Sequence, residues 1–377
     1  MNDLSMVLTE PGPWTYAYID GHGGEPQGIE RSRRRAVIDA LGHAGSPTSD
    51  VEAIGRALDE DGGFPSPSTR FVLARQGRIE VDERFAGPRL GPELIGHGPV
   101  PCILPLLRHR AADVRYLVVE TGREGAQLRV ERAGRARAEA LQNVEGRTDS
   151  LPKVQAGGWS HLKYQQHSEE IWSQNQAEVA EAVERTVRER APRFVVVAGD
   201  VRARQLLRDQ LGPHARELVV EVDAHTRAAG SDSGALDSAV AEAVERAVNE
   251  DLRAVLDRAA ADNEATGAHG LAEVVTALQQ ARVDTLVLDA RLLDATETLD
   301  ALDGPPWLDD GSGGEGLGAD RVAALPLAEA LARTAVLSGA RVLVTEDETA
   351  PGEPRAARGT HPPIASLRWS AGGAESA

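Results

Sequence analysis

The sequence contains very little cysteine, with one residue, Cys102, in a chain of 377. A single thiol excludes a disulfide framework within the chain and any zinc or iron–sulfur site built from several cysteines, and it is typical of a reducing compartment. No apolar run approaches the roughly 18 residues that a membrane-spanning helix needs, and the first residues lack the basic start and apolar core of a signal peptide. We therefore expect a cytoplasmic protein that is neither secreted nor membrane-spanning and holds no metal.

The usual signatures of nucleotide and hydrolase sites are also missing. There is no Gly-Lys dipeptide for a phosphate-binding loop and no His-Glu-x-x-His zinc motif. The glycines of 21–24 lack the spacing of a dinucleotide fingerprint, and the serine-containing segment 230–234 follows no apolar strand, as a nucleophile elbow requires. Asp223 and His225 have the chemistry of an acid/base pair, but residues of this kind also cap the turn after a strand, which we favour. We expect no bound cofactor.

Lysine is nearly absent too, since Lys153 and Lys163 are the only two among 41 basic residues. The formal net charge is −18, which argues against generic binding to DNA or membrane surfaces, because both are polyanions. The charge is segregated: residues 105–168 hold 11 Lys and Arg against 7 Asp and Glu. Any contact with nucleic acid should therefore be local and should involve this basic segment.

A Gly/Pro-rich connection over 87–101 and a second boundary near 229–234 predict three regions, 1–100, 101–232 and 233–377. Their patterns of strands and helices indicate an α/β class with an α+β N-terminal part. In the first region we expect a strand at 14–20, helices at 32–41 and 51–58, and a hairpin over 71–85 that turns at Gln76-Gly77. The second region should contain a hairpin of 115–120 and 127–132, a polar loop over 143–158, a helix over 160–190, a buried parallel strand at 194–199, a helix at 202–211 and a strand at 217–222.

The third region repeats the alternation of helices and strands. We expect helices at 235–261, 271–282 and 325–338, strands at 284–289 and 341–346, and an edge strand at 364–369 before a disordered tail. An acidic, glycine-rich loop over 303–320 should carry Trp307 back onto the domain.

One segment, from Lys153 to Trp172, combines features that favour RNA contact. Two glycines permit unusual backbone angles, Ser160 can cap the following helix, and a helix N-terminus attracts phosphate. Basic, aromatic and glutamine side chains add charge, base stacking and hydrogen bonding. The residues that we predict to bind RNA are Arg147, Lys153, Gln155, Gly157, Gly158, Trp159, Ser160, His161, Lys163, Tyr164, Gln165 and Gln166. The alternative is an exposed loop that only caps the helix, with Trp159 folded onto its own domain.

The segment GGWSHLKYQQHSEEIW resembles the Gly-Gly-Gln segment of archaeal and eukaryotic class-one release factors. More closely, the chain resembles the bacterial release-factor-like family, which is related to those factors, to Pelota and to Vms1-type peptidyl-tRNA hydrolases, and which includes the hibernation factor Balon. The order of ALQQARVDTLVLD, PLAEALARTAVLSGARVLVTED and IASLRW supports this resemblance in the third region. The resemblance implies three domains: an N-terminal one directed at the decoding centre, an RNase H-like middle one, and an L7Ae-like C-terminal one.

The resemblance implies that this segment corresponds to the release-factor loop that enters the peptidyl-transferase centre. In the release factors, the glutamine of that loop places a water molecule against the peptidyl-tRNA ester. Here the motif reads Gly157-Gly158-Trp159, and an indole has one donor and no acceptor, so it cannot reproduce the amide's contacts. We therefore favour a ribosome-binding hibernation or stress factor that occupies the A site of the 70S ribosome and keeps it idle. The resemblance also suggests elongation factor Tu and P-site tRNA as partners.

Two other functions remain open at this point. The first is a peptidyl-tRNA hydrolase, rescue factor or release factor, in which Gln155, Gln165 or Gln166 takes over the missing amide, although each stands at a different register. The second is an adaptor protein that never contacts RNA. The fate of the peptidyl-tRNA ester distinguishes the first from a hibernation factor, and cosedimentation with ribosomes distinguishes the second.

Overall fold

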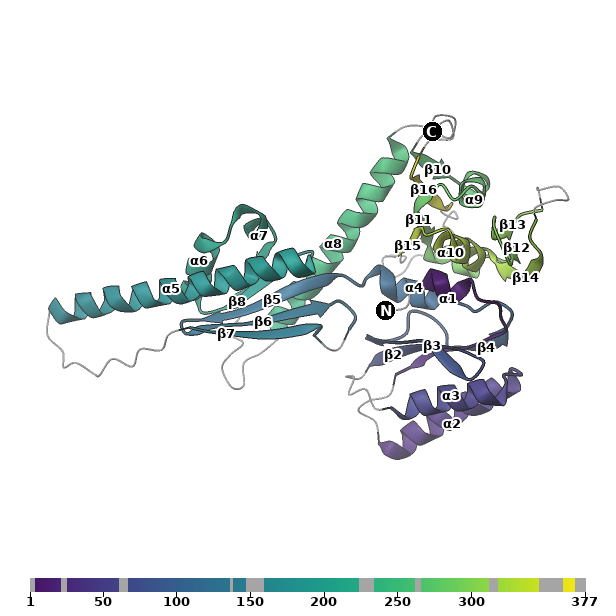
Figure 1. Cartoon of the computed structure of the whole chain (residues 1–377), viewed down its shortest axis with the longest axis horizontal. Coiled ribbons are helices and arrows are strands. Elements are labelled where there is room, and N and C mark those ends of the chain that lie inside the picture. The colour runs from purple at the N-terminus through teal and green to yellow at the C-terminus, as the bar shows by residue number, and fades with distance from the viewer. Residues whose placement is uncertain are drawn as a thin grey trace, which may run out of the picture. The chain divides into compact units, whose positions relative to one another are not determined.

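The computed structural model describes residues 4–21, 26–60, 67–135, 138–146, 159–223, 234–261, 266–311, 318–345 and 362–369. The chain forms two compact units, residues 1–111 with 250–377 and residues 112–249 (Figure 1). The described part of the first unit contains two four-stranded sheets and a three-stranded sheet, and that of the second contains a five-stranded sheet, which confirms the α/β class and agrees with three domains. The predicted limits at residues 100 and 232 stay predictions, as do the RNase H-like and L7Ae-like assignments.

The N-terminal sheet of the first unit has the order β3-β2-β1-β4 and is antiparallel throughout. The β2–β3 turn lies at Gln76 and Gly77 as predicted, and both have positive φ, as a two-residue hairpin requires. Helices α2 and α3 cover the sheet face that carries Ala17 and Ile19. The elements are α1 (Leu4–Leu8), β1 (Trp14–Asp20), α2 (Gln27–His43), α3 (Thr48–Asp59), β2 (Ser68–Arg75), β3 (Arg78–Ala86), β4 (Leu94–Gly98) and α4 (Leu104–Ala111).

The sheet of the second unit has the order β7-β6-β5-β8-β9, antiparallel from β7 to β5 and parallel from β5 to β9. All five residues of β8 are buried, because α5 and α6 cover one face and α8 covers the other. The elements are β5 (Arg115–Gly122), β6 (Gly125–Arg132), β7 (Ala140–Glu145), α5 (Trp159–Arg190), β8 (Val195–Gly199), α6 (Val201–Gln210), α7 (Pro213–Glu217), β9 (Val219–Glu221) and α8 (Gly234–Ala260), whose last residues belong to the first unit.

Two predictions for this unit need correction. The polar loop was expected from residue 143, but residues 140–145 form β7, which pairs with β6 despite its polar sequence. The strand expected at 217–222 is shorter, because residues 213–217 form α7, which begins at a proline in its first turn. The sequence pattern did not indicate β7 because its residues are mostly polar and exposed, which an edge strand tolerates.

The C-terminal part of the first unit has a main sheet of order β10-β16-β11-β15 and a small sheet of order β13-β12-β14. Trp307 is partly buried and packs against the hydrophobic core, as predicted. The elements are β10 (Gly267–His269), α9 (Leu271–Gln279), β11 (Val283–Asp289), a 3-10 helix (Ala290–Asp294), β12 (Thr298–Leu302), β13 (Leu308–Asp309), β14 (Arg321–Pro326), α10 (Leu327–Leu337), β15 (Arg341–Thr345) and β16 (Ile364–Leu367).

A strand does form at Ile364–Leu367, within the predicted 364–369, but the prediction that it lies at the edge of the sheet is wrong. Strand β16 lies inside the sheet, paired antiparallel with β10 on one side and with β11 on the other. The small sheet was also missed: β13 lies in the segment expected to be a loop, and no strand was predicted where β12 and β14 lie. The helix predicted from residue 325 begins at Leu327, because Leu325 and Pro326 end β14. The predicted tail lies outside the described residues. In the part of the chain that the structure describes, no helix is both long and apolar enough to cross a membrane.

Candidate functional site

The predicted RNA-binding residues lie on and before the start of α5. This helix begins at Trp159, so Ser160 stands within its first turn and not ahead of it, as the predicted cap would. Seven of the predicted residues are part of α5, namely Trp159, Ser160, His161, Lys163, Tyr164, Gln165 and Gln166. Their side chains lie outside what the structure describes, as do Arg147, Lys153, Gln155, Gly157 and Gly158 entirely. The predicted contacts of all twelve stay predictions.

The described part of α5 is anchored to the sheet by two adjacent buried amides, Asn175 and Gln176. The Gln176 Oε1 accepts a hydrogen bond of 2.8 Å from the Thr121 hydroxyl, and its Nε2 donates to the Gly122 carbonyl at 2.9 Å. Thr121 and Gln176 are both fully buried. A buried pair of this kind holds its elements in one geometry, because breaking it leaves polar groups without partners.

Asn175 ties α5 to the segment where β7 ends. Its Nδ2 donates to the Arg123 carbonyl at 3.1 Å, and the backbone N–H of Gly146 donates to the Glu124 carbonyl at 2.8 Å. A Cβ on Gly146 would lie 2.3 Å from the Asn175 Cγ, so only glycine fits at this position. The chain therefore leaves the sheet at Gly146 directly beside the helix that carries Trp159.

Two charged residues, Arg123 and Asp200, interact beside this anchor. The Arg123 guanidinium lies over the Trp172 ring at 4.6 Å, and its Nε donates to Asp200 Oδ2 at 3.2 Å. Asp200 also caps α6 by accepting from the backbone N–H groups of Arg202 and Ala203. Burial alone would raise the pKa of Asp200, but these N–H groups and Arg123 hold the pKa below its usual value. The carboxylate thus stays charged and fixes Arg123 on Trp172.

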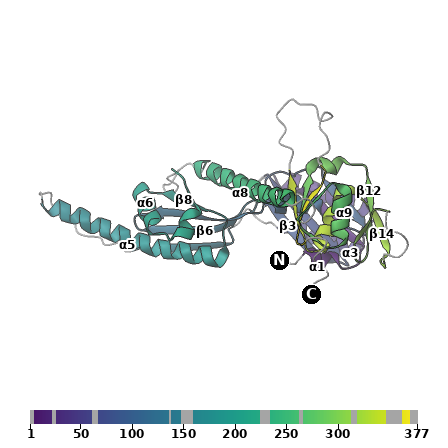
Figure 2. The same ribbon diagram turned by 90° about the horizontal axis from the view of Figure 1, so that it is seen from above.

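The N-terminal half of α5 extends beyond the sheet to which the helix is anchored (Figures 1 and 2). Sixteen residues separate Asn175 from Trp159, which at 1.5 Å per residue corresponds to about 24 Å along the helix axis. Among the side chains of α5 that the structure describes, from Glu169 on, the first buried ones are Asn175 and Gln176, and Glu169, Glu170 and Gln174 are exposed. The start of α5 is thus carried away from the sheet on a helix whose base is fixed.

Sequence reasoning missed the four residues of this anchor, Thr121, Arg123, Asn175 and Gln176. A signal was present, because Trp172, Val179, Val183 and Val187 mark the inner face of α5, and the two amides occupy the helical turn that is missing from this series. A polar pair on an otherwise apolar face indicates buried hydrogen bonding.

The other predicted sites gain little from the structure. Asp223 forms an ion pair with Arg204 of α6, whereas His225 and the serines of 230–233 lie outside the described residues. Residues 22–24 of the early glycine segment also lie outside them. Among the residues that the structure describes, no three His, Cys, Asp or Glu side chains gather as metal ligands.

Residues 115–265 match the family model described as bacterial archaeo-eukaryotic release factor family 2. The protein Rv2629 of Mycobacterium tuberculosis (strain ATCC 25618 / H37Rv), which is uncharacterized, is 26% identical over 293 residues, 76% of this chain and 77% of that protein. An archaeal translation termination factor is 15% identical over 97% of this chain and 96% of its own, with a TM-score of 0.26. Archaeoglobus fulgidus Pelota is 16% identical over 82% of both chains, with a TM-score of 0.34.

Proposed function

We propose that this chain, whose residues 115–265 match the family model described as bacterial archaeo-eukaryotic release factor family 2, is a ribosome-binding translation factor. It occupies the A site of the 70S ribosome and keeps the ribosome idle under stress, and its Gly-Gly-Trp loop is directed at the peptidyl-transferase centre. The observation that carries the proposal is the position of Trp159 at the start of a helix whose base is fixed by buried hydrogen bonds.

The shape of the second unit supports insertion into a narrow RNA channel. A single helix has a diameter of about 10–12 Å with its side chains, and α5 projects by about 24 Å beyond its anchor at Asn175. Residues 105–168 are also the basic part of an acidic chain. The first ten residues of α5 carry Lys163 and no Asp or Glu, so this slender projection can approach RNA, which would repel an acidic globular surface.

The same geometry argues against hydrolysis of peptidyl-tRNA. The Trp159 indole offers one N–H donor and no acceptor, so it cannot hold a water molecule as glutamine does. Gln165 and Gln166 lie six and seven residues further along α5, about 9–10 Å from Trp159 along the axis. A group that must place a water molecule loses orders of magnitude in rate when it is displaced by far less. Base stacking by Trp159 remains the available chemistry.

The proposed partners are ribosomal RNA of the A site and the end of a P-site tRNA, with elongation factor Tu as the factor that accompanies delivery. The competing function is a peptidyl-tRNA hydrolase or rescue factor, and the glutamines on the first turns of α5 are the residues that favour it. The two functions differ only in what happens to the ester bond once the loop is in place.

The experiment pairs two assays on one preparation of the full chain. Cosedimentation with 70S ribosomes is followed across a salt series, and release of labelled peptide is measured from a loaded P-site tRNA. We expect binding that weakens with salt, no peptide release, and weaker binding when Lys153 and Lys163 are both changed to alanine. Trp159→Gln tests whether restoring the amide creates release in a protein that already binds.

Either of two results would contradict the proposal. Peptide release by the wild-type chain that is lost in Gln165→Ala or Gln166→Ala would move the protein to the hydrolases. An absence of cosedimentation at every salt concentration would leave an adaptor that does not contact RNA.

A further inference from the structure

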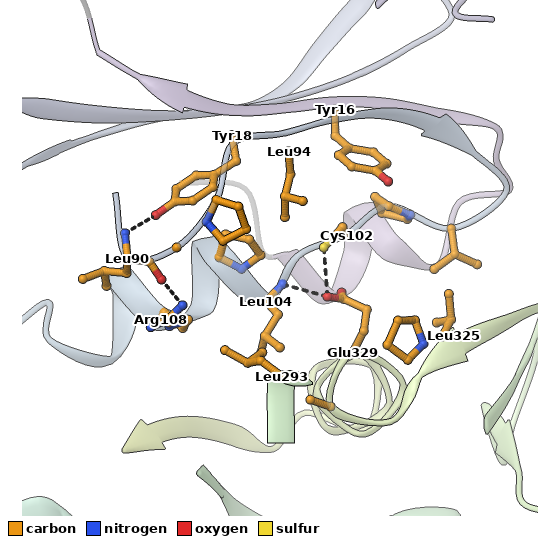
Figure 3. A pocket seen from close by; sticks show the side chains of 17 residues that line it. Tyr16, Tyr18, Leu90, Leu94, Cys102, Leu104, Arg108, Leu293, Leu325 and Glu329 are labelled. Atoms are coloured by element: carbon orange, nitrogen blue, oxygen red, sulfur yellow. Dashed lines mark hydrogen bonds between the residues drawn. The ribbon is translucent and has the colours of Figure 1, made fainter. Parts of the chain in front are cut away.

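A cavity of about 390 Å³ lies within the first unit, where β1 and β4 face α10 (Figure 3). Its wall is formed by the segment 90–105 on one side and by β14 and α10 on the other. Most of the lining is apolar, and it contains the side chains of Leu94, Leu104, Leu293 and Leu325 with several prolines. Small-molecule sites in proteins have volumes of this order and the same composition, an apolar wall with a few polar groups.

Two tyrosines of β1 point into this cavity (Figure 3). Tyr16 and Tyr18 are two residues apart in one strand, so they lie on the same face of the sheet. The Tyr18 hydroxyl is occupied: it accepts from the Leu90 backbone N–H at 2.7 Å and lies 2.9 Å from His109 Nε2. Among the described residues, the Tyr16 hydroxyl has no hydrogen-bond partner, although it faces the same cavity.

A glycine on the neighbouring strand makes room for Tyr16. Gly96 is directly opposite Tyr16 in the β1–β4 pair, and a Cβ on it would lie 2.5 Å from the Tyr16 hydroxyl oxygen. The tyrosine ring therefore lies across the backbone of β4, and its hydroxyl is carried to the cavity wall. Any other residue at position 96 would displace the ring.

The charged groups of the lining are already engaged inside the protein. The Glu329 carboxylate accepts from the Ile103 N–H at 2.6 Å and from the Leu104 N–H at 3.2 Å, and Arg108 donates to the Leu90 carbonyl. Burial, and then the acidic groups of Cys102 and Glu329, raise the pKa of Tyr16, so its hydroxyl keeps its proton and acts as a donor. The cavity therefore suits a neutral ligand better than an ion.

We propose that this cavity binds a neutral, flat, mostly aromatic small molecule that presents one hydrogen-bond acceptor to the Tyr16 hydroxyl. The two tyrosine rings and the proline rings of the wall provide flat apolar surfaces for such a ligand. The bound molecule contacts β1, β4 and α10 together and thereby stabilises the first unit, because it binds only when these elements are assembled. This site is independent of the loop that precedes α5.

The test uses the neutral fluorescent naphthyl ketone Prodan, whose emission reports an apolar surrounding, with the full chain. We expect saturable binding of one probe per chain with a blue shift and a rise in melting temperature. Tyr16→Phe removes only the hydroxyl and should weaken binding by about 3- to 10-fold. Tyr116→Phe is the matched control, because its hydroxyl bonds to Glu131 in the other unit, and it should bind Prodan like the wild type.

A second variant fills the space itself. Leu94 points into the cavity from β4, so Leu94→Trp should abolish Prodan binding while circular dichroism stays that of the wild type (Figure 3). An absence of saturable binding to the wild type would overturn the proposal. Unchanged affinity in Tyr16→Phe would overturn it as well, whether or not the tryptophan variant folds.

Discussion

Replacing Gln176 by leucine tests whether buried hydrogen bonds set the base of α5. The substitution removes the acceptor of the Thr121 hydroxyl and the donor to the Gly122 carbonyl, bonds of 2.8 and 2.9 Å in a fully buried place. Each buried polar group that loses its partner costs about 1–3 kcal/mol. With leucine's apolar gain as a partial offset, we expect the second unit to lose about 2–4 kcal/mol of stability.

The chain offers a matched control two residues away. Gln174 lies on the same helix but is exposed, so Gln174→Leu introduces the same side chain without orphaning a buried group. We expect this variant to change stability by no more than about 0.5 kcal/mol. The comparison separates the loss of the buried bonds from any general effect of leucine on α5.

Hydrogen exchange read by mass spectrometry measures this locally in the full chain, which is necessary because two units need not unfold together. In peptides from β5, where Thr121 lies, amides should exchange about 30- to 700-fold faster in Gln176→Leu. Wild-type exchange in this variant, or equal acceleration in Gln174→Leu, would refute the role assigned to the anchor. Gln176→Leu should also weaken ribosome cosedimentation if the direction of α5 matters for binding.

Three further results are expected from other parts of the molecule. Because burial raises the pKa of Glu329, the folded state holds the carboxyl proton more tightly than the unfolded state does. This proton therefore adds most to the free energy of unfolding below the ordinary carboxyl pKa of 4.5, and its contribution declines as the pH rises. Urea unfolding of Glu329→Gln across pH should lack this component. Burial and Glu329 hold the pKa of the Cys102 thiol well above its usual value, so a disulfide reagent at about pH 8 should label the native chain at least about tenfold more slowly than the unfolded chain. Gly199→Ala should destabilise the second unit by about 3 kcal/mol or more, because the Cβ would lie 2.0 Å from the Thr121 carbonyl oxygen. Gly134→Ala, whose Cβ would have nothing within 4 Å, should destabilise it by only about 1 kcal/mol, and hydrogen exchange measures both losses.

The sequence by itself determined the elements whose signal is local. The apolar run of β8 and the three- and four-residue spacing of Trp172, Val179, Val183 and Val187 on α5 are patterns of neighbouring residues, and both elements were predicted within one or two residues. The turn at Gln76-Gly77 was equally local. The Gly-Gly-Trp motif was local as well, and the resemblance to the release-factor-like family rested on several short runs of consecutive residues, such as GGWSHLKYQQHSEEIW.

Only the tertiary structure decided which distant segments meet. The interior place of β16 depends on hydrogen bonds to β10 and β11, strands that lie some 80 to 100 residues earlier and that no local pattern identifies. The partner of Gln176 is Thr121, 55 residues away, and the cavity beside Tyr16 exists only because α10 lies opposite β1. Burial is a property of the assembled chain, and a polar group becomes an anchor or an open donor only once its surroundings exclude water.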